Sequence, residues 1–556
     1  MKQYRYIFTL LTIVFIVSCD DSFLEKSPSD AISTATFFKQ EKDLVFAVNA
    51  AYNVLGFNDW GEWGRGTDML RLDIVTDDAI DHHSWDPAYR LADGTAGASE
   101  GYSTARWRER YKGIQRVNRI LEGADGVTDI NPDFKDRLLA EAKVLRAYFY
   151  FDLTYLFGDV PFLTSSISPE ELTPTVNDDG SLTPAAGAAR TDRNIILDAL
   201  VEELDAIKMD LPLTYGGSDK GRVTRGTALF LKAKMLLMQE KWTESAAASK
   251  ELMDLGVYSL YPSYENLFTY EGIGNNEVIL DVQVKQDVDE GEFYWLNFGP
   301  NSVGGWSVSC PLQSLVDTYE LTDGKTIEDS PLYDSENPYD NRDPRLGYSI
   351  LYPGADWRGG VYNTIPGATY PGKTIIPGDD LTDGTGGQWN KTSTGYNWLK
   401  YISNEDIDVS NVWDGGVHYI LMRYADALLM YAESKIEAGA IDASVYDAIN
   451  QVRQRPDVMM PEIPTGLSQA ELREIVRRER RVELAFEGQR LFDIRRWDIA
   501  KDVMPGVPKG LTYKDENGND VTLTWGERTF DPGKHGLWPI PQAEIDVTGM
   551  EQNPGW

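Results

Sequence analysis

Apolar residues in the first half of the chain recur every three or four positions, a spacing that predicts amphipathic helices. The clearest stretch is 134–157, and another helix is expected to begin near Ser103. One face of the 134–157 helix would be formed by Leu138, Ala142, Leu145, Phe149, Leu153 and Leu156. Gly158 and Pro161 mark its end, because glycine permits a left-handed turn and proline cannot continue a helix. We therefore expect a mainly α-helical scaffold.

Two helical hairpins follow from the same periodicity. The first covers 224–239 and 242–255, and the second covers 421–438 and 442–455. The residues expected to cap or end these helices are Thr224, Gly256, Gly439, Asp442 and Pro456. Helix pairs of this length resemble tetratricopeptide units, although their spacing is not that of a contiguous solenoid. An unrelated helical bundle is the alternative on periodicity alone.

Between 258 and 419 the pattern changes from periodic helices to loops. Ten glycines lie between Leu351 and Tyr396. A loop region of this length is usually either functional or disordered, and its aromatic residues favour an ordered, functional region. These aromatic residues are Trp357, Tyr362, Tyr370, Trp389, Tyr396 and Trp398. Short strands are expected at Glu277–Val284 and near Gly347–Leu351.

The start of the chain has the pattern of an export signal. A basic beginning is followed by an apolar run over Ile7–Val17, which is too short to span a bilayer permanently. Ser18 and Cys19 complete a lipobox-like sequence, which predicts 1–18 as a signal peptide and 19–32 as a lipidated tether. Two or more acyl chains hold a protein stably on a bilayer. An ordinary secretory signal with an incidental cysteine is the alternative.

The composition narrows the class of ligand. A net charge of −35 argues against binding nucleic acid or an anionic lipid surface, and it suits a neutral ligand. Many of the 15 tryptophans and 29 tyrosines lie in polar, glycine-rich surroundings, which is typical of carbohydrate binding, where flat rings stack on sugars. Cys310 has no partner once Cys19 is acylated, so no disulfide framework is expected. No later segment is apolar enough to predict a transmembrane helix.

The segment 478–497 raises the question of catalysis. Glu479, Glu483 and Glu487 are four residues apart and would share one helical face, with arginines between them. Paired carboxylates can hydrolyse glycosides, but flanking arginines should lower the pKa of each carboxyl group, which is wrong for a proton donor. Ion-paired helix packing is the better interpretation. Because no phosphate-binding glycine loop or nucleophile elbow occurs, we expect no enzyme activity and no cofactor.

Acidic residues and histidines are concentrated at 77–83. Zinc and calcium sites are alternatives here, but adjacent histidines diverge in direction and the stretch has no calcium-loop motif. No metal is therefore expected. We interpret the stretch as a polar loop on the ligand-binding face that leads to Trp85.

Eight short motifs occur in order along the chain. They lie at 23–28, 140–150, 156–161, 341–346, 423–433, 478–497, 538–541 and 552–556. The two most distinctive read AEAKVLRAYFY at 140–150 and RERRVELAFEGQRLFDIRRW at 478–497. In combination they resemble the SusD/RagB family of Bacteroidetes outer-membrane lipoproteins. Two departures are mild, namely Arg453–Pro456 in place of the usual alanine-glycine continuation, and Trp556 where tyrosine is commoner.

The resemblance implies a SusD-like fold, mainly α-helical, in which four tetratricopeptide-like helix pairs form the scaffold. Opposite them it implies a loop-rich ligand-binding face with a few short strands. The implied segments are a helical N-terminal part at 33–260 and a C-terminal part at 261–556, which comprises loops at 261–419, helices at 420–501 and a tail at 502–556. The implied location is the outer surface of the outer membrane, reached through the N-terminal lipid. The implied partner is a SusC-like TonB-dependent transporter, over which the lipoprotein sits as a lid.

Two regions are expected to carry the aromatic rings that stack on a sugar, the loop Asp81–Tyr89 and the segment after the strand at Glu277–Val284. SusD-like proteins commonly take stacking rings from these two places. The residues expected to contact ligand are the rings Trp85, Trp295 and Trp306, together with Tyr294, Asp81, His82 and Asn301. Weaker candidates are Trp60, Trp63, Trp357 and Trp389, whereas Trp107, Trp497 and Trp538 are expected in the core. The expected function is capture of an oligo- or polysaccharide and its delivery to the transporter, without catalysis. A peptide-binding or purely gating lid is the alternative.

Overall fold

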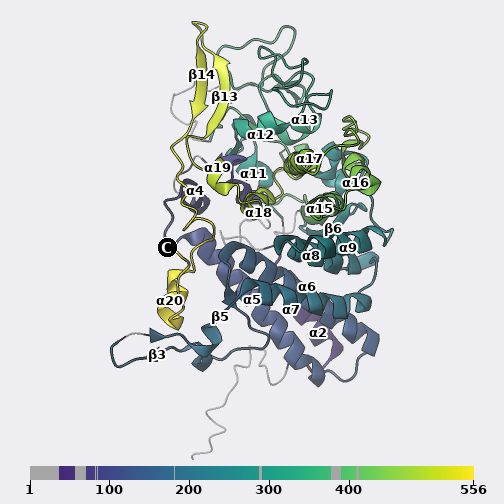
Figure 1. The fold of residues 1–556 in the computed structure, drawn as a ribbon, viewed down its shortest axis with the longest axis vertical. Coiled ribbons are helices and arrows are strands. Elements are labelled where there is room, and N and C mark those ends of the chain that lie inside the picture. Colours follow the sequence, from purple (N-terminus) through teal and green to yellow (C-terminus); the bar gives the residue numbers. More distant parts are fainter. Residues whose placement is uncertain are drawn as a thin grey trace, which may run out of the picture.

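The computed structural model describes residues 37–56, 70–81, 83, 86–180, 182–286, 291–376, 390–407 and 412–556. Figure 1 shows the long helices of the first half side by side in the lower part of the molecule, with short helices and the hairpin β13–β14 above them. The longer helices are α2 (Glu41–Tyr52), α5 (Gly101–Gly123), α6 (Pro132–Phe157), α7 (Arg193–Ile207), α8 (Arg225–Met238), α9 (Trp242–Met253), α15 (Tyr424–Glu437), α16 (Ala443–Arg453) and α17 (Gln469–Glu483).

These helices pack largely in chain order. α5 contacts α6, α6 contacts α7, α7 contacts α8, and α8 contacts α9. α9 then packs on α15, which also contacts α16 and α17. The predicted mainly α-helical fold is confirmed. That its helix pairs are tetratricopeptide-like stays a prediction.

Helix α6 lies in the core and matches the helix predicted at 134–157. Asn131 caps its N-terminus by accepting a hydrogen bond from the Phe134 N–H (3.1 Å), and Pro132 fits the first turn because no intrahelical donor is needed there. Most residues from Leu138 onward are buried, so α6 is covered on nearly all sides. Gly158 ends the helix with φ 76°, as predicted.

The first predicted hairpin is confirmed as α8 and α9. The Thr224 side chain caps α8 by accepting from the Thr227 N–H (3.3 Å). Gly256 follows α9 with φ 65°, a left-handed conformation that glycine adopts without steric cost.

The second predicted hairpin begins later than the periodicity indicated. Residues Tyr419–Arg423 form strand β12, which pairs antiparallel with β6 (Val278–Val282), and α15 starts only at Tyr424. All five residues of β12 are buried, and a short apolar run of this kind cannot be told from a buried helix by its period. β6 confirms the strand expected near 277–284.

Small antiparallel strand pairs stabilise the loops. The other pairs are β1 (Ala79–Asp81) with β7 (Ser309–Pro311), β2 (Val160–Pro161) with β5 (Arg190–Thr191), β3 (Thr175–Val176) with β4 (Leu182–Thr183), β8 (Ile350–Leu351) with β11 (Asn397–Trp398), β9 (Asp356–Trp357) with β10 (Gly360–Val361), and β13 (Lys509–Lys514) with β14 (Asp520–Thr524). The strand expected from Gly347 is therefore wrong in extent, because α13 continues to Ser349 and only the last two positions pair.

Short helices occupy the remaining connections. They are α4 (Pro87–Asp93), α10 (Tyr264–Leu267), α11 (Tyr294–Phe298), α12 (Gln313–Thr318), α13 (Arg345–Ser349), α14 (Asn404–Ile407), α18 (Arg490–Arg496), α19 (Ala500–Val503) and α20 (Gln542–Thr548). None of the helices in the described ranges combines the length and apolarity needed to cross a bilayer.

Buried ion pairs join α17 to the loop-rich part. The Glu483 carboxylate accepts hydrogen bonds from Arg345 (2.9 Å), Arg423 (2.7 Å) and Arg455 (2.9 Å). The ion-paired packing predicted for this segment is therefore confirmed. The shared helical face is wrong in one respect, because α17 ends at Glu483 and Glu487 lies in the following turn.

The interpretation of 77–83 as a polar loop is wrong. Asp77 pairs with Arg490 (2.8 Å) and Arg481 (2.9 Å), and Asp78 pairs with Arg481 (2.7 Å). The residues that follow form the buried strand β1. Because arginines of α17 and α18 neutralise the two aspartates, the stretch can enter the protein interior.

The tryptophans expected in the core are confirmed there. Trp107 is 2% exposed, Trp538 is 3% exposed and Trp497 is 9% exposed. The Trp107 and Trp538 rings both contact Phe157 at the end of α6, with centroids 5.1 and 5.9 Å away.

Candidate ligand-binding site

Three aromatic rings gather in the loop-rich part, and two of them reach the surface. The Trp306 and Trp413 rings have centroids 5.4 Å apart and an interplanar angle of 70°. The Trp413 ring also lies 5.8 Å from that of Phe293. Phe293 is buried, Trp306 is half-buried and Trp413 is 39% exposed, more than any other tryptophan in the described ranges. We call these three residues the aromatic cluster.

The segment after α11 positions Trp306. The chain passes through a 3₁₀ turn at Asn301–Val303 and reverses at Gly304, whose φ of 89° favours glycine. The Trp306 N–H then donates to the Leu296 carbonyl (2.7 Å), which ties the returning chain to α11. Ser307 follows with φ 46°, an uncommon conformation for a residue with a side chain. The backbone at Trp306 is therefore fixed by its neighbours.

A short backbone pairing positions Trp413. Glu292 and Gly415 exchange both N–H···O hydrogen bonds, at 2.9 and 2.6 Å. This bridge holds the residues around Trp413 beside the beginning of α11. The Trp413 ring consequently packs against Phe293.

The strand pair β1–β7 brings a third segment to the same region. Asp81 at the end of β1 is opposite Ser309, which lies three residues after Trp306. His83 is buried, and its Nδ1 lies 3.0 Å from Asp81 Oδ1. Asp86 is also buried and accepts a hydrogen bond from the Ala88 N–H (2.8 Å). Asp81 thus lies beside the strand that follows Trp306, and His83 is held against Asp81.

The residues predicted to contact ligand have different outcomes in the structure. Some lie outside the described ranges, and others are buried. Trp85, His82 and Cys19 lie outside the described residues, as do the weaker candidates Trp60, Trp63 and Trp389. Asp81 and Tyr294 are 0% exposed and Trp295 is 3% exposed. In this structure their side chains present no open surface to a ligand. Trp357 is also buried, at 7% exposed.

Two predicted residues lie at the surface of this region. Trp306 belongs to the aromatic cluster. Asn301 is half-buried, and its Nδ2 donates to the Gly305 carbonyl (3.1 Å) within the same loop. The amide therefore stiffens the turn beside the Trp306 ring.

Sequence reasoning missed Trp413, although a signal was present. Trp413 is followed by Asp414 and two glycines, and Trp306 is preceded by two glycines. Both indoles thus lie in polar, glycine-rich sequence, the surroundings typical of a sugar-stacking ring. Their approach depends on the Glu292–Gly415 bridge, which joins residues far apart in the chain.

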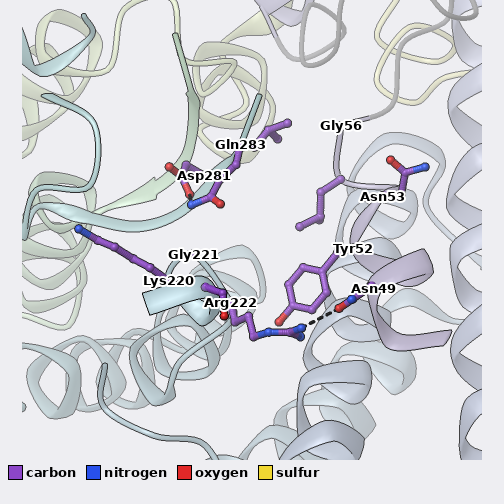
Figure 2. Close-up of a pocket in the computed structure, with 12 residues that line it drawn as sticks. Asn49, Tyr52, Asn53, Gly56, Lys220, Gly221, Arg222, Asp281 and Gln283 are labelled. Atoms are coloured by element: carbon purple, nitrogen blue, oxygen red, sulfur yellow. Dashed lines mark hydrogen bonds between the residues drawn. The ribbon is translucent and has the colours of Figure 1, made fainter. Parts of the chain in front are cut away.

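A cavity of about 350 Å³ lies between α2 and the end of β6 (Figure 2). Arg222 Nη2 donates to Asn49 Oδ1 (2.7 Å), and Nη1 donates to Glu141 Oε2 (2.8 Å). The same guanidinium lies 5.5 Å from the Tyr52 ring centroid, so it covers a face of that ring. The cavity is polar, but Arg222 already covers a face of Tyr52, its aromatic residue. We therefore do not interpret this cavity as a surface for sugar stacking.

A second cavity, of about 420 Å³, lies between α12 and residues 503–509. Arg481 at its wall is paired with Asp77 (2.9 Å) and Asp78 (2.7 Å). None of its described lining residues is aromatic, so it offers no surface for stacking. The aromatic cluster is the part of the described structure that best fits the binding of a sugar ring.

Two family models match this chain. A model described as "SusD family" matches residues 276–556. A second model, described as "Starch-binding associating with outer membrane", matches residues 22–185.

Individual relatives align along nearly the whole chain. SusD-like protein P25 of Formosa agariphila is 25% identical over 567 residues, covering 98% of this chain and 97% of that protein. A SusD-like carbohydrate-binding protein of Bacteroides fragilis has a crystal structure that matches with a TM-score of 0.78 at 30% identity, covering 92% of this chain and 99% of the other. Surface glycan-binding protein A of Bacteroides fluxus has the same fold, with a TM-score of 0.67 at 21% identity, covering 93% and 99%.

Proposed function

Because the chain belongs to the SusD family, we propose that it captures an oligo- or polysaccharide at the aromatic cluster and delivers it to a transporter without catalysis. The observation that carries this proposal is the pair of surface indoles, Trp306 and Trp413, in a family whose members include a carbohydrate-binding protein and surface glycan-binding proteins.

The chemistry of the cluster supports a sugar ligand. An indole ring presents a flat apolar face of the size of a pyranose, and Trp413 exposes 39% of its surface. Each stacked ring contributes about 0.5–1.5 kcal/mol beyond burial. Two or three rings with hydroxyl hydrogen bonds then give a Kd on the order of micromolar to millimolar, or about −8 to −4 kcal/mol. Such weak binding suits a protein that must release its ligand to a partner.

The buried carboxylates of α17 support a function without catalysis. Burial would raise the pKa of Glu479, but Arg345 and Arg453 outweigh burial and lower it. Arg423, Arg455 and Arg345 likewise outweigh burial at Glu483. A carboxyl group held ionised in this way cannot donate a proton to a glycosidic oxygen.

Membership of the family also supports a location and a partner for this protein. We infer that Cys19 carries the lipid anchor, that the protein is displayed on the outer membrane and that a SusC-like TonB-dependent transporter receives the ligand. One matching model is described as associating with the outer membrane, which supports the location. Co-purification of the transporter with a tagged full-length chain from its native membrane tests the partner.

The glycan proposal is tested with substitutions in the aromatic cluster. We expect Trp413→Ala and Trp306→Ala each to weaken binding of the best glycan-array ligand at least tenfold in isothermal titration calorimetry, because each removes a stacking face. Trp85→Ala should have the same effect if that residue completes the platform, as predicted from the sequence.

Phe46→Ala is the matched control, because Phe46 is an aromatic residue on α2 that is 60% exposed. This variant should bind like the parent protein. Equal affinity in the parent, Trp306→Ala and Trp413→Ala would remove the cluster as the site. Binding of peptides and of no glycan would instead favour the peptide-binding alternative.

A further inference from the structure

The hairpin β9–β10 carries an arginine in a backbone conformation that such a turn usually gives to other residues. Trp357 pairs with Gly360, so Arg358 and Gly359 form the loop between the two strands. Their φ values are 46° and 77°. Positive φ at both loop positions is the pattern of a type I′ turn, whose first position favours asparagine, aspartate or glycine. Arg358 is therefore strained in its own turn.

The contacts of Arg358 lie at the surface of the protein. The residue is exposed, and no atom lies within 4 Å of the Cβ position of its neighbour Gly359, so the turn borders open space. The guanidinium carbon is 5.9 Å from the Trp357 ring centroid, close to the limit of a cation–π contact. An asparagine would fit this turn with less strain. A strained residue that is kept at an exposed turn points to a role in function.

One contact joins this hairpin to the segment that carries Trp306. Trp357 belongs to a small buried hydrophobic cluster, and Val303 packs against that cluster. Val303 closes the 3₁₀ turn that comes three residues before Trp306. The base of the hairpin therefore lies beside the loop that positions Trp306.

A second contact joins the hairpin to the segment that carries Trp413. Arg358 Nη1 donates to Asn404 Oδ1 (3.1 Å) at the start of α14. Asp406, two residues further along α14, lies against Gly415, because a Cβ atom on that glycine would be 3.1 Å from Asp406 Cγ. Gly415 follows Trp413 by two residues. The guanidinium is thus held next to both segments of the aromatic cluster.

A guanidinium has the chemistry to recognise a sugar beside a stacking surface. Its N–H donors form a planar fork, which can donate in parallel to two neighbouring oxygens. Stacking on an apolar ring face distinguishes poorly between sugars that differ in the orientation of one hydroxyl group, whereas a fixed pair of donors distinguishes them well. Glu405 follows Asn404 at the surface, so an acidic sugar would meet a like charge there. The arrangement therefore favours a neutral sugar.

We propose that Arg358 is a specificity-determining residue of the ligand-binding site. Its guanidinium donates to two neighbouring hydroxyl groups of a neutral oligosaccharide, on a sugar unit beyond those that stack on Trp306 and Trp413. Asn404 positions the guanidinium for this contact. This inference rests on the proposed function, because it adds a contact to a sugar that is held at the aromatic cluster.

The strained turn provides a test that needs no ligand. Arg358→Asn in the purified full chain should raise the thermal midpoint by about 1 °C or more, because asparagine is favoured at this turn position. Met459→Asn is the matched control for relief of backbone strain, because Met459 has φ 49°, is 64% exposed and lies between α16 and α17. Its midpoint should rise in the same way. A lower midpoint for Arg358→Asn would overturn the proposal, because the arginine would then stabilise the hairpin.

Calorimetry with sugars of two lengths tests the contact itself. The probes are the neutral hexasaccharide that the parent protein binds best on a glycan array, and the disaccharide of the same linkage. Arg358→Asn should weaken hexasaccharide binding by about tenfold or more and change disaccharide binding less than about twofold, because a disaccharide covers only the two indoles. Arg358→Lys keeps the charge but not the planar fork, so its hexasaccharide affinity should stay about fivefold or more below that of the parent. Met459→Asn should bind both sugars like the parent.

The outcomes separate this inference from the proposed function. If Trp413→Ala loses hexasaccharide binding and Arg358→Asn does not, the proposed function stands and the role of Arg358 is overturned. Equal weakening of both sugars by Arg358→Asn would also overturn it, because the aromatic cluster itself would then be disturbed. Parent-like affinity of Arg358→Lys would overturn recognition of paired hydroxyl groups. A parent protein that binds no neutral hexasaccharide on the array would overturn both proposals.

Discussion

At the scale of single residues, the environment of Glu483 shows how charge is buried in this protein. Its carboxylate meets the guanidinium groups of Arg345, Arg423 and Arg455, and all four residues are at most 1% exposed. Burial alone would raise the pKa of Glu483, but the three arginines outweigh it and lower that pKa well below the usual range. The side chain therefore joins helices α17 and α13, strand β12 and the turn after α16 at one point.

Replacing Glu483 should be costly. Glu483→Gln leaves three buried guanidinium groups without their shared counter-charge, so we expect the free energy of unfolding to fall by about 3–5 kcal/mol. Urea denaturation followed by tryptophan fluorescence measures the change. Glu474→Gln on the exposed side of α17 is the control and should change stability by less than about 0.5 kcal/mol. Similar stabilities for the two variants would show that the buried ion pairs contribute little.

The same residue shows a limit of sequence reasoning. The arginines next to Glu483 in sequence suggested its partners, yet Arg480 pairs with Asp426 and Arg481 pairs with Asp78. The partners of Glu483 come from segments 28 to 138 residues away. Ion pairing was predictable because charged residues are rarely buried alone. The choice of partner was not predictable, because any buried arginine satisfies a carboxylate equally well at the level of sequence.

At the scale of elements, the end of α6 shows how a local signal also serves tertiary packing. Gly158 has φ 76° and ψ −127°, a region that only glycine populates readily. The C-terminal tail packs directly on this end, since the Trp538 N–H donates to the Leu156 carbonyl (2.8 Å) and Asn553 Nδ2 donates to the Phe157 carbonyl (2.9 Å). The helix stop thus forms the docking place for the last residues of the chain.

A series of glycine substitutions separates these contributions. Gly158→Ala should lower the free energy of unfolding by about 1–3 kcal/mol because of backbone strain. The close contact of the new Cβ with Leu537 Cδ1, at 2.8 Å, should lower it further. Gly439→Ala, at φ 68° with nothing near its Cβ, should cost only about 1–2 kcal/mol.

Gly97→Ala is the control for this series, because no atom lies within 4 Å of its Cβ position and its φ is not positive. It should be neutral or slightly stabilising. Denaturation midpoints of the three variants, measured together, test the order. A Gly158→Ala protein as stable as Gly97→Ala would contradict the account of the α6 end.

At the scale of the whole molecule, the surface charge bears on the class of ligand. The net charge of −35 creates a field that repels anions, and the exposed ring of the aromatic cluster carries no charge of its own. This field does not repel a neutral saccharide, because the sugar carries no net charge. A sulfated or uronic glycan would have to approach against it.

This difference can be measured by changing the salt concentration. We expect the Kd for a neutral oligosaccharide to change less than about twofold between 50 and 500 mM NaCl, because stacking and hydroxyl contacts are not screened by salt. A sulfated oligosaccharide of equal length should bind more weakly, and its binding should improve as salt screens the repulsion. A steep loss of affinity for the neutral sugar at high salt would show that ionic contacts dominate instead.

Sequence by itself determined the helices at 134–157 and 224–255, the Thr224 cap, the glycines that follow these helices and the membership of the family. The helix at 134–157 and the pair at 224–255 were predictable because apolar period, N-cap and glycine stop are local properties of adjacent residues. Tertiary structure alone decided that 419–423 form a strand and that Tyr294 and Trp295 turn inward. It alone brought Trp413 to Trp306. These outcomes depend on which distant segment of the chain packs against each of these residues. Neither the spacing of apolar residues in a segment nor its composition specifies that neighbour.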